Sequence, residues 1–248
     1  MSLVVLMYHR VNDILEPSDL VVPTKKFEEQ MCFLKKNYEV ISINSIREAL
    51  TNKQTNRLDG QNLAAGKVLL TFDDGYRDNY LNAYPILKRL GLSAAIFLIT
   101  DMIGTDKKRQ RYSHLPLPDM LRWEEVVQMA EAGINFGMHT HTHPHLPELS
   151  LQEQREEIDK SIQILTEHLG NLLSEHLFFA YPYGEYNQDT LKILKQLKIK
   201  FAFTVEAIIN TTQTNYLELG RVGINGLDTI YDFSKKLKAL FEQESRVR

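Results

Sequence analysis

The chain has 248 residues, of which 43% are hydrophobic and 25% are charged, and its formal net charge at pH 7 is −3. This composition is ordinary for a globular protein with a sizeable core, and no Lys/Arg block points to nucleic acid or to an anionic membrane surface. The single cysteine, Cys32, excludes an internal disulfide framework and a cysteine-based zinc site.

No apolar run approaches the 18 residues of a membrane-spanning helix. The first ten residues lack the basic start and the long apolar stretch of a secretory signal. The sequence as it stands therefore predicts a cytoplasmic protein. If a leader was removed ahead of the opening Met-Ser-Leu, the protein would instead act outside the cytoplasm.

Short apolar runs along the chain predict strands. They cover residues 3–8, 39–43, 67–72, 93–99, 134–138, 177–181, 200–204 and 217–224. Apolar residues at helical spacing predict helices between these strands. The first begins at Thr24 as its N-cap and places Phe27, Met31 and Leu34 on one face; the others cover 45–50, 79–90, 123–132, 151–169, 188–197 and 230–241.

Three further features qualify this pattern. Pro85 falls inside the helix predicted over 79–90, so it should kink that helix or mark its real start. Residues 51–66 are polar and predict a surface loop. The irregular stretch over 101–120 is long for a compact domain, and loops of that length are often functional.

Strands alternate with helices along the whole length, without repeats or a linker, which predicts one α/β domain over residues 1–248. Seven or eight βα units at this length favour a single closed, distorted TIM-like barrel over an open doubly wound sheet. In both architectures the active site lies at the carboxyl ends of the strands. Three chemically distinctive segments fall at such ends.

The first segment is the acidic pair Asp73 and Asp74, directly after the predicted strand 67–72. An acidic pair before a glycine is often only a turn or a helix cap. Its position at a strand end favours function, because two adjacent carboxylates can divide the work of metal binding and proton transfer.

The second segment places four of the eight histidines within seven residues. His139 and His143 are four apart, and so are His141 and His145, so spacing alone leaves two registers for a shared metal ion. An accidental surface cluster is the alternative. Neutral imidazole and carboxylate are the usual ligands of a catalytic zinc-type ion, so the two segments together indicate a metal-assisted hydrolase.

The third segment, Tyr181-Pro182-Tyr183-Gly184, is by itself only typical of a turn. Trp123, the single tryptophan, could pack its helix or face a substrate. His9 ends the first predicted strand, so it could lie in the core or at the site.

These segments resemble the motifs of the polysaccharide deacetylase family, the NodB-homology or family 4 carbohydrate esterases. Residues 71–75 resemble the first motif, residues 139–144 the second, residues 181–184 the third and, more loosely, residues 119–123 the fourth. The opening residues 7–11 resemble members that act on poly-N-acetylglucosamine, the intercellular-adhesin type. The resemblance runs from about residue 3 to about residue 225.

The chain departs from the family pattern in two places. Ala180 stands where the third motif usually has an arginine, and no histidine follows His176 to supply the fifth motif. The residue that usually orients the base and the usual general acid are therefore both missing from their expected positions.

The resemblance implies a hydrolase that removes N-acetyl groups from a glycan. It assigns Asp74, His139 and His143 to one divalent ion, by default Zn²⁺, with Co²⁺, Ni²⁺ and Fe²⁺ compatible with the same ligands. It implies Asp73 as the general base, the backbone N–H of Tyr183 as an oxyanion donor, and residues 181–183 as substrate contacts. We add His9 as the candidate acid and Trp123 as a candidate substrate contact.

Two other functions fit the sequence. One is a hydrolase of a small amide or formamide on the same fold, which a closed pocket would favour over an open groove. The other is a glycan-binding domain whose catalytic site has decayed, which the missing arginine and histidine suggest. The sequence identifies neither the sugar and its linkage nor the oligomeric state.

Overall fold

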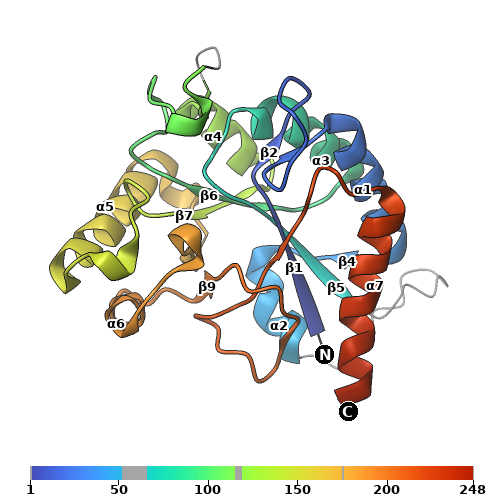
Figure 1. Ribbon diagram of the computed structural model, residues 1–248. Helices are drawn as coiled ribbons and strands as arrows, with labels where there is room; N and C mark the ends of the chain where they lie inside the picture. The colour runs from blue at the N-terminus through green and yellow to red at the C-terminus, as the bar shows by residue number, and fades with distance from the viewer. Residues whose placement is uncertain (1, 52–65, 115–118, 175, 248) are drawn as a thin grey trace.

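The computed structural model describes residues 2–51, 66–114, 119–174 and 176–247 (Figure 1). The predicted loop over 51–66 therefore lies, apart from its two end residues, outside the described part of the chain. Among the described residues, no helix is both long enough and apolar enough to cross a membrane.

The main sheet places β1, β5, β6, β7, β8 and β9 side by side in parallel. These strands are β1 (Ser2–Tyr8), β5 (Lys67–Phe72), β6 (Ala95–Leu98), β7 (Asn135–Met138), β8 (Phe178–Ala180) and β9 (Phe201–Phe203). Shorter strands complete the sheet: β4 (Glu39–Val40) on β5, and β10 (Asn210–Thr211) and β11 (Val222–Gly223) on β1. A separate ladder joins β2 (Arg10–Val11) to β3 (Val21–Val22).

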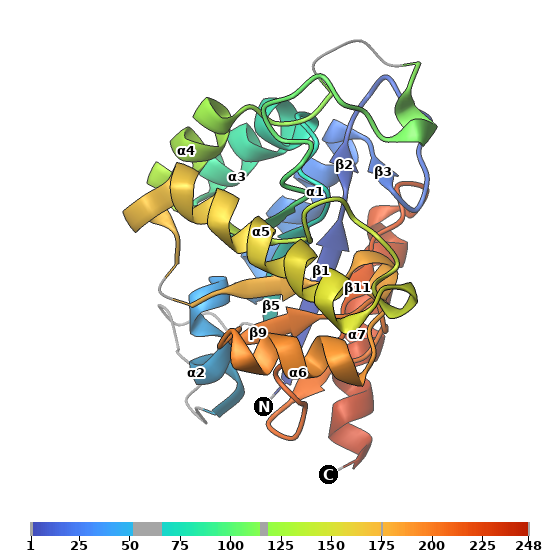
Figure 2. The ribbon, with the colours of Figure 1, turned by 90° about the vertical axis from the view of Figure 1, so that its left-hand side faces the viewer.

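Helices cover the outer face of this curled sheet, whereas the short helix over residues 46–51 packs with the inward-facing Leu3, Val5 and Leu69 (Figures 1 and 2). They are α1 (Thr24–Asn37), α2 (Ile46–Thr51), α3 (Tyr84–Leu90), α4 (Trp123–Glu131), α5 (Leu151–Leu169), α6 (Gln188–Gln196) and α7 (Ile230–Val247). The predicted distorted α/β barrel is confirmed.

The segment over residues 216–224 joins the two sides of the curled sheet. The Leu219 N–H donates to the carbonyl of Ala202 in β9 at 2.9 Å, and the Ile224 N–H donates to the carbonyl of Met7 in β1 at 3.1 Å. Only β11 within this segment forms regular strand, so the predicted strand over 217–224 is mostly irregular backbone. Its apolar pattern comes from burial between β9 and β1.

Alternate residues of β5 face two different cores, as the two-residue period of a strand requires. Val68, Leu70 and Phe72 pack with the helices outside the sheet, whereas Leu69 packs in the second core cluster with Phe97 of β6. Because Thr71 and Asp73 follow Leu69 in the same register, the strand directs the Asp73 carboxylate to the inside of the barrel. The strand pattern therefore positions the first acid of the motif.

Two details of the helix predictions need correction or refinement. Pro23, not Thr24, occupies the N-cap of α1. The Thr24 hydroxyl is buried without a hydrogen bond, and the backbone N–H of Thr24 donates to the Asp13 carboxylate at 2.8 Å. Pro85 lies in the first turn of α3, behind a short π-helical stretch over 79–83, so it marks the real start of the α-helix. Proline has no N–H to donate, and the turn just before it, in which the Tyr84 N–H donates to the Asn79 carbonyl, is π-helical rather than α-helical.

Candidate active site

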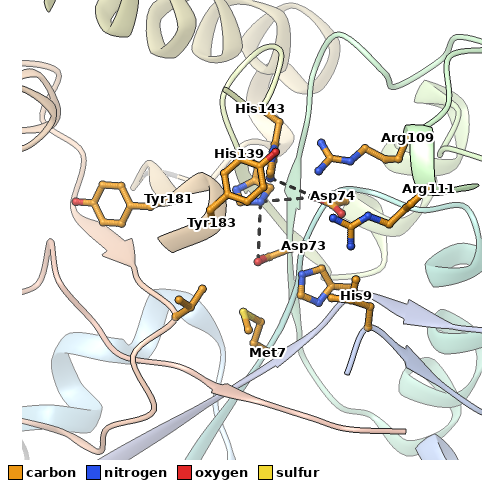
Figure 3. A pocket seen from close by; sticks show the side chains of 12 residues that line it. Met7, His9, Asp73, Asp74, Arg109, Arg111, His139, His143, Tyr181 and Tyr183 are labelled. Atoms are coloured by element: carbon orange, nitrogen blue, oxygen red, sulfur yellow. Dashed lines mark ion pairs between the residues drawn. The ribbon is translucent and has the colours of Figure 1, made fainter. Parts of the chain in front are cut away.

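The segments that follow β1, β5, β7 and β8 meet around one cavity of about 150 Å³ (Figure 3). The cavity brings together most of the site residues expected from the sequence with others that were not expected. Its lining consists of Met7, His9, Leu20, Asp73, Asp74, Arg109, Arg111, His139, His143, Tyr181, Tyr183 and Val205.

Asp74, His139 and His143 form a group that could hold a metal ion, with one ligand atom of each residue within 4.8 Å of the others. The Asp74 Oδ1 lies 3.6 Å from the His139 Nε2 and 3.7 Å from the His143 Nε2. All three residues are buried. Two imidazole nitrogens and one carboxylate oxygen are the donors of a catalytic metal site that keeps further positions open, so the residues fit the ion that the family implies.

The backbone around this group is held in unusual conformations. Asp74, Thr140, His143 and Tyr183 all have positive φ angles, between 58° and 72°. Left-handed backbone costs a non-glycine residue about 1–2 kcal/mol and persists only where the surroundings impose it. Such strain often accumulates at functional sites, and here it turns the ligand side chains toward one another.

One hydrogen bond orients the His139 ring, and another fixes the backbone at His143. The His139 Nδ1 lies 2.8 Å from the carbonyl oxygen of Ala180, which can only accept, so this nitrogen carries the hydrogen and the Nε2 lone pair faces Asp74. Ala180 thus contributes through its backbone where the family pattern has an arginine side chain. The His143 N–H donates to the Thr140 hydroxyl at 2.9 Å and fixes the turn between the two histidines.

The imidazoles are kept neutral in the folded protein. Burial lowers the pKa of His139, and burial together with the neighbouring His139 lowers the pKa of His143 to about 3. For Asp74, burial alone would raise the pKa, but the nearby imidazoles and Arg109 outweigh burial and lower it. Neutral imidazoles beside an ionised carboxylate are the protonation states that a divalent ion requires of its ligands.

Asp73 is paired with Arg221, a residue that the sequence analysis missed. The guanidinium donates to both carboxylate oxygens, Nη1 to Oδ1 at 2.7 Å and Nη2 to Oδ2 at 2.8 Å, and its Nε donates to the Thr204 carbonyl at 2.9 Å. Burial would raise the pKa of Asp73, but Arg221 outweighs burial and holds this pKa well below its usual range. Arg221 is fully buried and reaches the site from the segment that joins β9 to β1.

The remaining histidines of the cluster have other partners. The His141 Nδ1 lies 3.1 Å from the Thr100 hydroxyl, and its Nε2 lies 3.8 Å from the Asp101 carboxylate. His145 pairs with Glu185 at 2.7 Å, and its ring stacks on that of Tyr183 with centroids 3.9 Å apart. The structure therefore groups His139 and His143 with Asp74, and it places His141 and His145 apart from them.

His9 lies at the cavity, as its position at the end of β1 suggested. Its side chain approaches Asp74 and Arg111 (Figure 3). The buried Nδ1 has no hydrogen-bond partner among the described residues. A polar nitrogen left without a partner beside the acidic pair is available to a bound molecule.

The third motif divides into structural and exposed parts. Tyr181 lines the cavity but is buried, and its hydroxyl donates to the Leu217 carbonyl at 2.7 Å, which ties the segment over 216–224 to β8. Pro182 is buried in the turn that follows. The Tyr183 ring lies against His143 and is 42% exposed, so it can meet a ligand.

Trp123 lies outside the cavity lining. Its ring stacks on that of His168 with centroids 3.8 Å apart, where the start of α4 meets the end of α5. The structure therefore gives Trp123 a packing contact and does not bring it to the other site residues.

A second buried arginine centre lies beneath the loop over 101–120, and the sequence analysis missed it as well. The Arg10 Nε donates to Asp78 at 2.7 Å, and its Nη2 donates to Asp119. The guanidinium lies between the rings of Tyr76 and Tyr112, 4.2 and 4.5 Å from their centroids. This centre ties β2 to Tyr112 and Asp119, which flank residues 115–118 in the sequence, and Tyr112 follows directly on Arg111 of the cavity lining.

The comparisons with known proteins agree with this geometry. The sequence profile of polysaccharide deacetylases matches residues 60–202. The Bacillus subtilis protein YxkH, which carries a polysaccharide deacetylase name, is 31% identical, with 90% of this chain and 72% of YxkH aligned. The chain therefore belongs to the polysaccharide deacetylase family, which is a family of hydrolases.

Other relatives carry more specific names. A poly-β-1,6-N-acetyl-D-glucosamine N-deacetylase of Staphylococcus aureus is 28% identical over 90% of this chain and 79% of its own length. The Streptococcus pyogenes deacetylase PplD, solved in complex with acetate, superposes with a TM-score of 0.78 at 27% identity, over 95% of this chain and 98% of PplD. IcaB from Ammonifex degensii superposes with a TM-score of 0.72 at 28% identity, over 90% and 91% of the two chains.

Proposed function

We propose that this protein is a metal-dependent N-deacetylase that acts on a glycan of the N-acetylglucosamine type. One observation carries the proposal: Asp74, His139 and His143 converge in the same buried cavity as Asp73, whose Oδ2 lies 4.0 Å from the His139 Nε2. The name of the S. aureus relative supports the substrate class. The site takes residues from β1 through the segment over 216–224, which supports one catalytic domain over residues 1–248.

The ligand set supports Zn²⁺ as the native ion, and Co²⁺, Ni²⁺ and Fe²⁺ are compatible with the same donors. When bound, such an ion polarises the acetyl carbonyl and lowers the pKa of the attacking water. The His139 Nδ1 hydrogen bond leaves the Nε2 lone pair of that ring free to coordinate the ion, and His143, neutral as well, can coordinate it through its Nε2, which lies 3.7 Å from Asp74.

Asp73 is the proposed general base. The pairing with Arg221 keeps its carboxylate ionised near neutral pH and fixes its direction, so it can accept the proton of the attacking water. The backbone N–H of Tyr183 is the proposed donor to the tetrahedral oxyanion, because the left-handed Tyr183 backbone borders the cavity. The proposed acid is His9. It would give its proton to the amine nitrogen as the C–N bond of the amide breaks, and the acetyl group is then released as acetate.

The shape of the site favours a glycan over a small amide. The cavity shares Arg109, Arg111, His143 and Tyr183 with a wider adjoining hollow of about 590 Å³. The exposed Tyr183 ring, supported by the stacked His145, is the proposed platform for a sugar ring, with Tyr181 and Pro182 holding it in place. The Arg221 pairing also weakens the case for a decayed site, because the base keeps a guanidinium partner despite Ala180.

The test combines metal analysis with acetate release from β-1,6-linked N-acetylglucosamine oligomers. The purified protein should contain about one divalent ion per chain and lose activity on chelation. His139→Ala and His143→Ala should lose the ion and the activity, whereas the matched control His141→Ala should keep both. Loss of the ion in His141→Ala, or full activity in metal-free protein, would disprove the assignment.

A further inference from the structure

Two arginines of the loop over 101–120 extend over the cavity toward Asp74 (Figure 3). Arg109 is half-buried and Arg111 is exposed, and both line the cavity as well as the adjoining hollow. Among the described residues, neither guanidinium forms an ion pair with a carboxylate, in contrast to Arg10 and Arg221. The deacetylation chemistry proposed above uses neither of them.

The charges around the cavity do not cancel. Asp73 is neutralised by Arg221, which leaves Asp74 with one negative charge against the two positive charges of Arg109 and Arg111. A divalent ion on the ligand group would add two further positive charges. The cavity rim is therefore cationic, although the whole chain carries a net charge of −3. A concave site with an excess of one sign of charge concentrates ligands of the opposite sign.

The rim has a fixed support. Tyr112, the neighbour of Arg111, is buried with its ring against the Arg10 guanidinium, and Asp119 at the far end of the loop accepts a hydrogen bond from the same group. The Arg77 N–H donates to the Asp119 carbonyl at 2.9 Å. This centre holds the loop near the cavity and so keeps the two guanidinium groups close to the metal-ligand group.

From this arrangement we propose that the physiological substrate carries an anionic group, a phosphate or a carboxylate, next to the N-acetylated sugar. Arg109 and Arg111 bind that group in the adjoining hollow while the acetamido group reaches Asp73 and Asp74. Guanidinium groups suit this role because their planar donors match the oxygens of phosphate and carboxylate. The inference rests on the proposed deacetylase function and adds a specificity to it.

Another role for these arginines predicts a different result. If they stabilised the oxyanion or the departing acetate, they would act on every N-acetylated substrate equally. If they select an anionic substrate, they raise kcat/KM only for glycans that carry the charge. The ratio of kcat/KM for an anionic substrate to that for a neutral one therefore separates the two roles.

The experiment measures acetate release from three matched probes: a neutral disaccharide of N-acetylglucosamine, the same disaccharide with a phosphodiester on the neighbouring sugar, and one whose neighbouring sugar is glucuronic acid. The wild-type protein should prefer one or both anionic probes by at least about tenfold, and the preferred probe identifies the anion. Arg109→Gln and Arg111→Gln should each reduce this preference by about tenfold. Arg89→Gln, which removes an exposed guanidinium paired with Glu28, should leave it unchanged.

A salt titration of the wild-type protein tests the proposal without any variant. Raising the ionic strength should lower kcat/KM for the preferred anionic probe more than for the neutral one, because salt screens exposed charges. Equal rates on all three probes, or an equal loss on all of them in both variants, would overturn the anionic substrate while leaving deacetylation intact. Acetate release from none of the probes would overturn the proposed function and this inference with it.

Discussion

Two buried arginines, Arg221 and Arg10, both pair with aspartates, but the two pairings have different roles. Arg221 gives both of its terminal nitrogens to the single carboxylate of Asp73 and lowers the pKa of that group. Arg10 is shared between Asp78 and Asp119, and burial raises the pKa of Asp78 despite the pairing. One centre holds a reactive carboxylate ionised, and the other joins segments of the fold.

The difference follows from the number of carboxylates that share each guanidinium. A single carboxylate with a bidentate partner is fully compensated, so its charged form is favoured even out of water. Two buried carboxylates on one guanidinium leave a negative charge uncompensated, so burial dominates the pKa. Sequence composition does not reveal which arrangement an aspartate occupies.

We expect the largest difference between the Arg221 and Arg10 centres in the turnover of variants that replace an aspartate. Asp73→Asn should reduce kcat by about 10²–10⁴-fold, because it removes the proposed base while preserving its size. The matched change Asp78→Asn at the Arg10 centre should stay within severalfold of wild type. Acetate release by metal-loaded protein, with metal content measured in parallel, gives the comparison. Equal losses in the two variants would mean that Asp73 has no special role in the reaction.

The next largest difference is expected in the pH dependence of kcat/KM when each arginine is removed. Arg221→Met and Arg10→Met should each lower the free energy of unfolding by about 3–5 kcal/mol, because each leaves buried carboxylates without their partner. Arg221 holds the pKa of Asp73 down, so its loss lets burial raise that pKa. The acidic limb of the kcat/KM profile should therefore move to higher pH in Arg221→Met alone.

Chemical unfolding and pH–rate profiles measure both quantities. Should the variants prove too unstable to assay, Arg221→Lys keeps a charge without the two-point contact, and its acidic limb should shift in the same direction by less. An unchanged acidic limb in both Arg221 variants would contradict the role assigned to this pair.

The smallest effect concerns the ring that covers Arg10. Tyr112→Leu should lower the free energy of unfolding by about 1–2 kcal/mol, because it removes one of the two aromatic faces against the guanidinium. Tyr231→Leu is the control, since the Tyr231 side chain is 69% exposed. Thermal unfolding of both proteins gives the result. If the two changes lower the free energy of unfolding equally, the stacked Tyr112 ring contributes no more stability than an ordinary surface residue.

The sequence predicted the elements and motifs that depend on local order. The strand over 67–72 was predicted correctly, because a short apolar run favours a buried strand and the acids and glycine after it favour the end of that strand. The register of the histidine cluster remained open from spacing alone, and the family resemblance favoured His139 and His143. The structure groups these two with Asp74.

The sequence did not predict contacts that depend on closing the barrel. Arg221 lies 148 positions from Asp73, and nothing in its own segment names its partner. A signal was nevertheless present: an arginine two residues after the buried Leu219, in a mostly apolar segment, should face the same interior and needs a carboxylate there. Arg10, two residues after the buried Tyr8 that ends β1, gave the same signal. Trp123 carried no comparable signal, because tryptophan packs as readily as it binds ligands.

The segment that carries Arg221 also sets when the site can exist during synthesis. The ribosome makes Asp73 148 residues before the only guanidinium that contacts it among the described residues. Until the segment over 216–224 has been added, a nascent barrel can bury Asp73 only as an uncompensated charge, which is strongly unfavourable, or as a neutral acid, which cannot serve as the base. The last part of the barrel thus completes the fold and the catalytic pair in one step, so a partly made chain has neither.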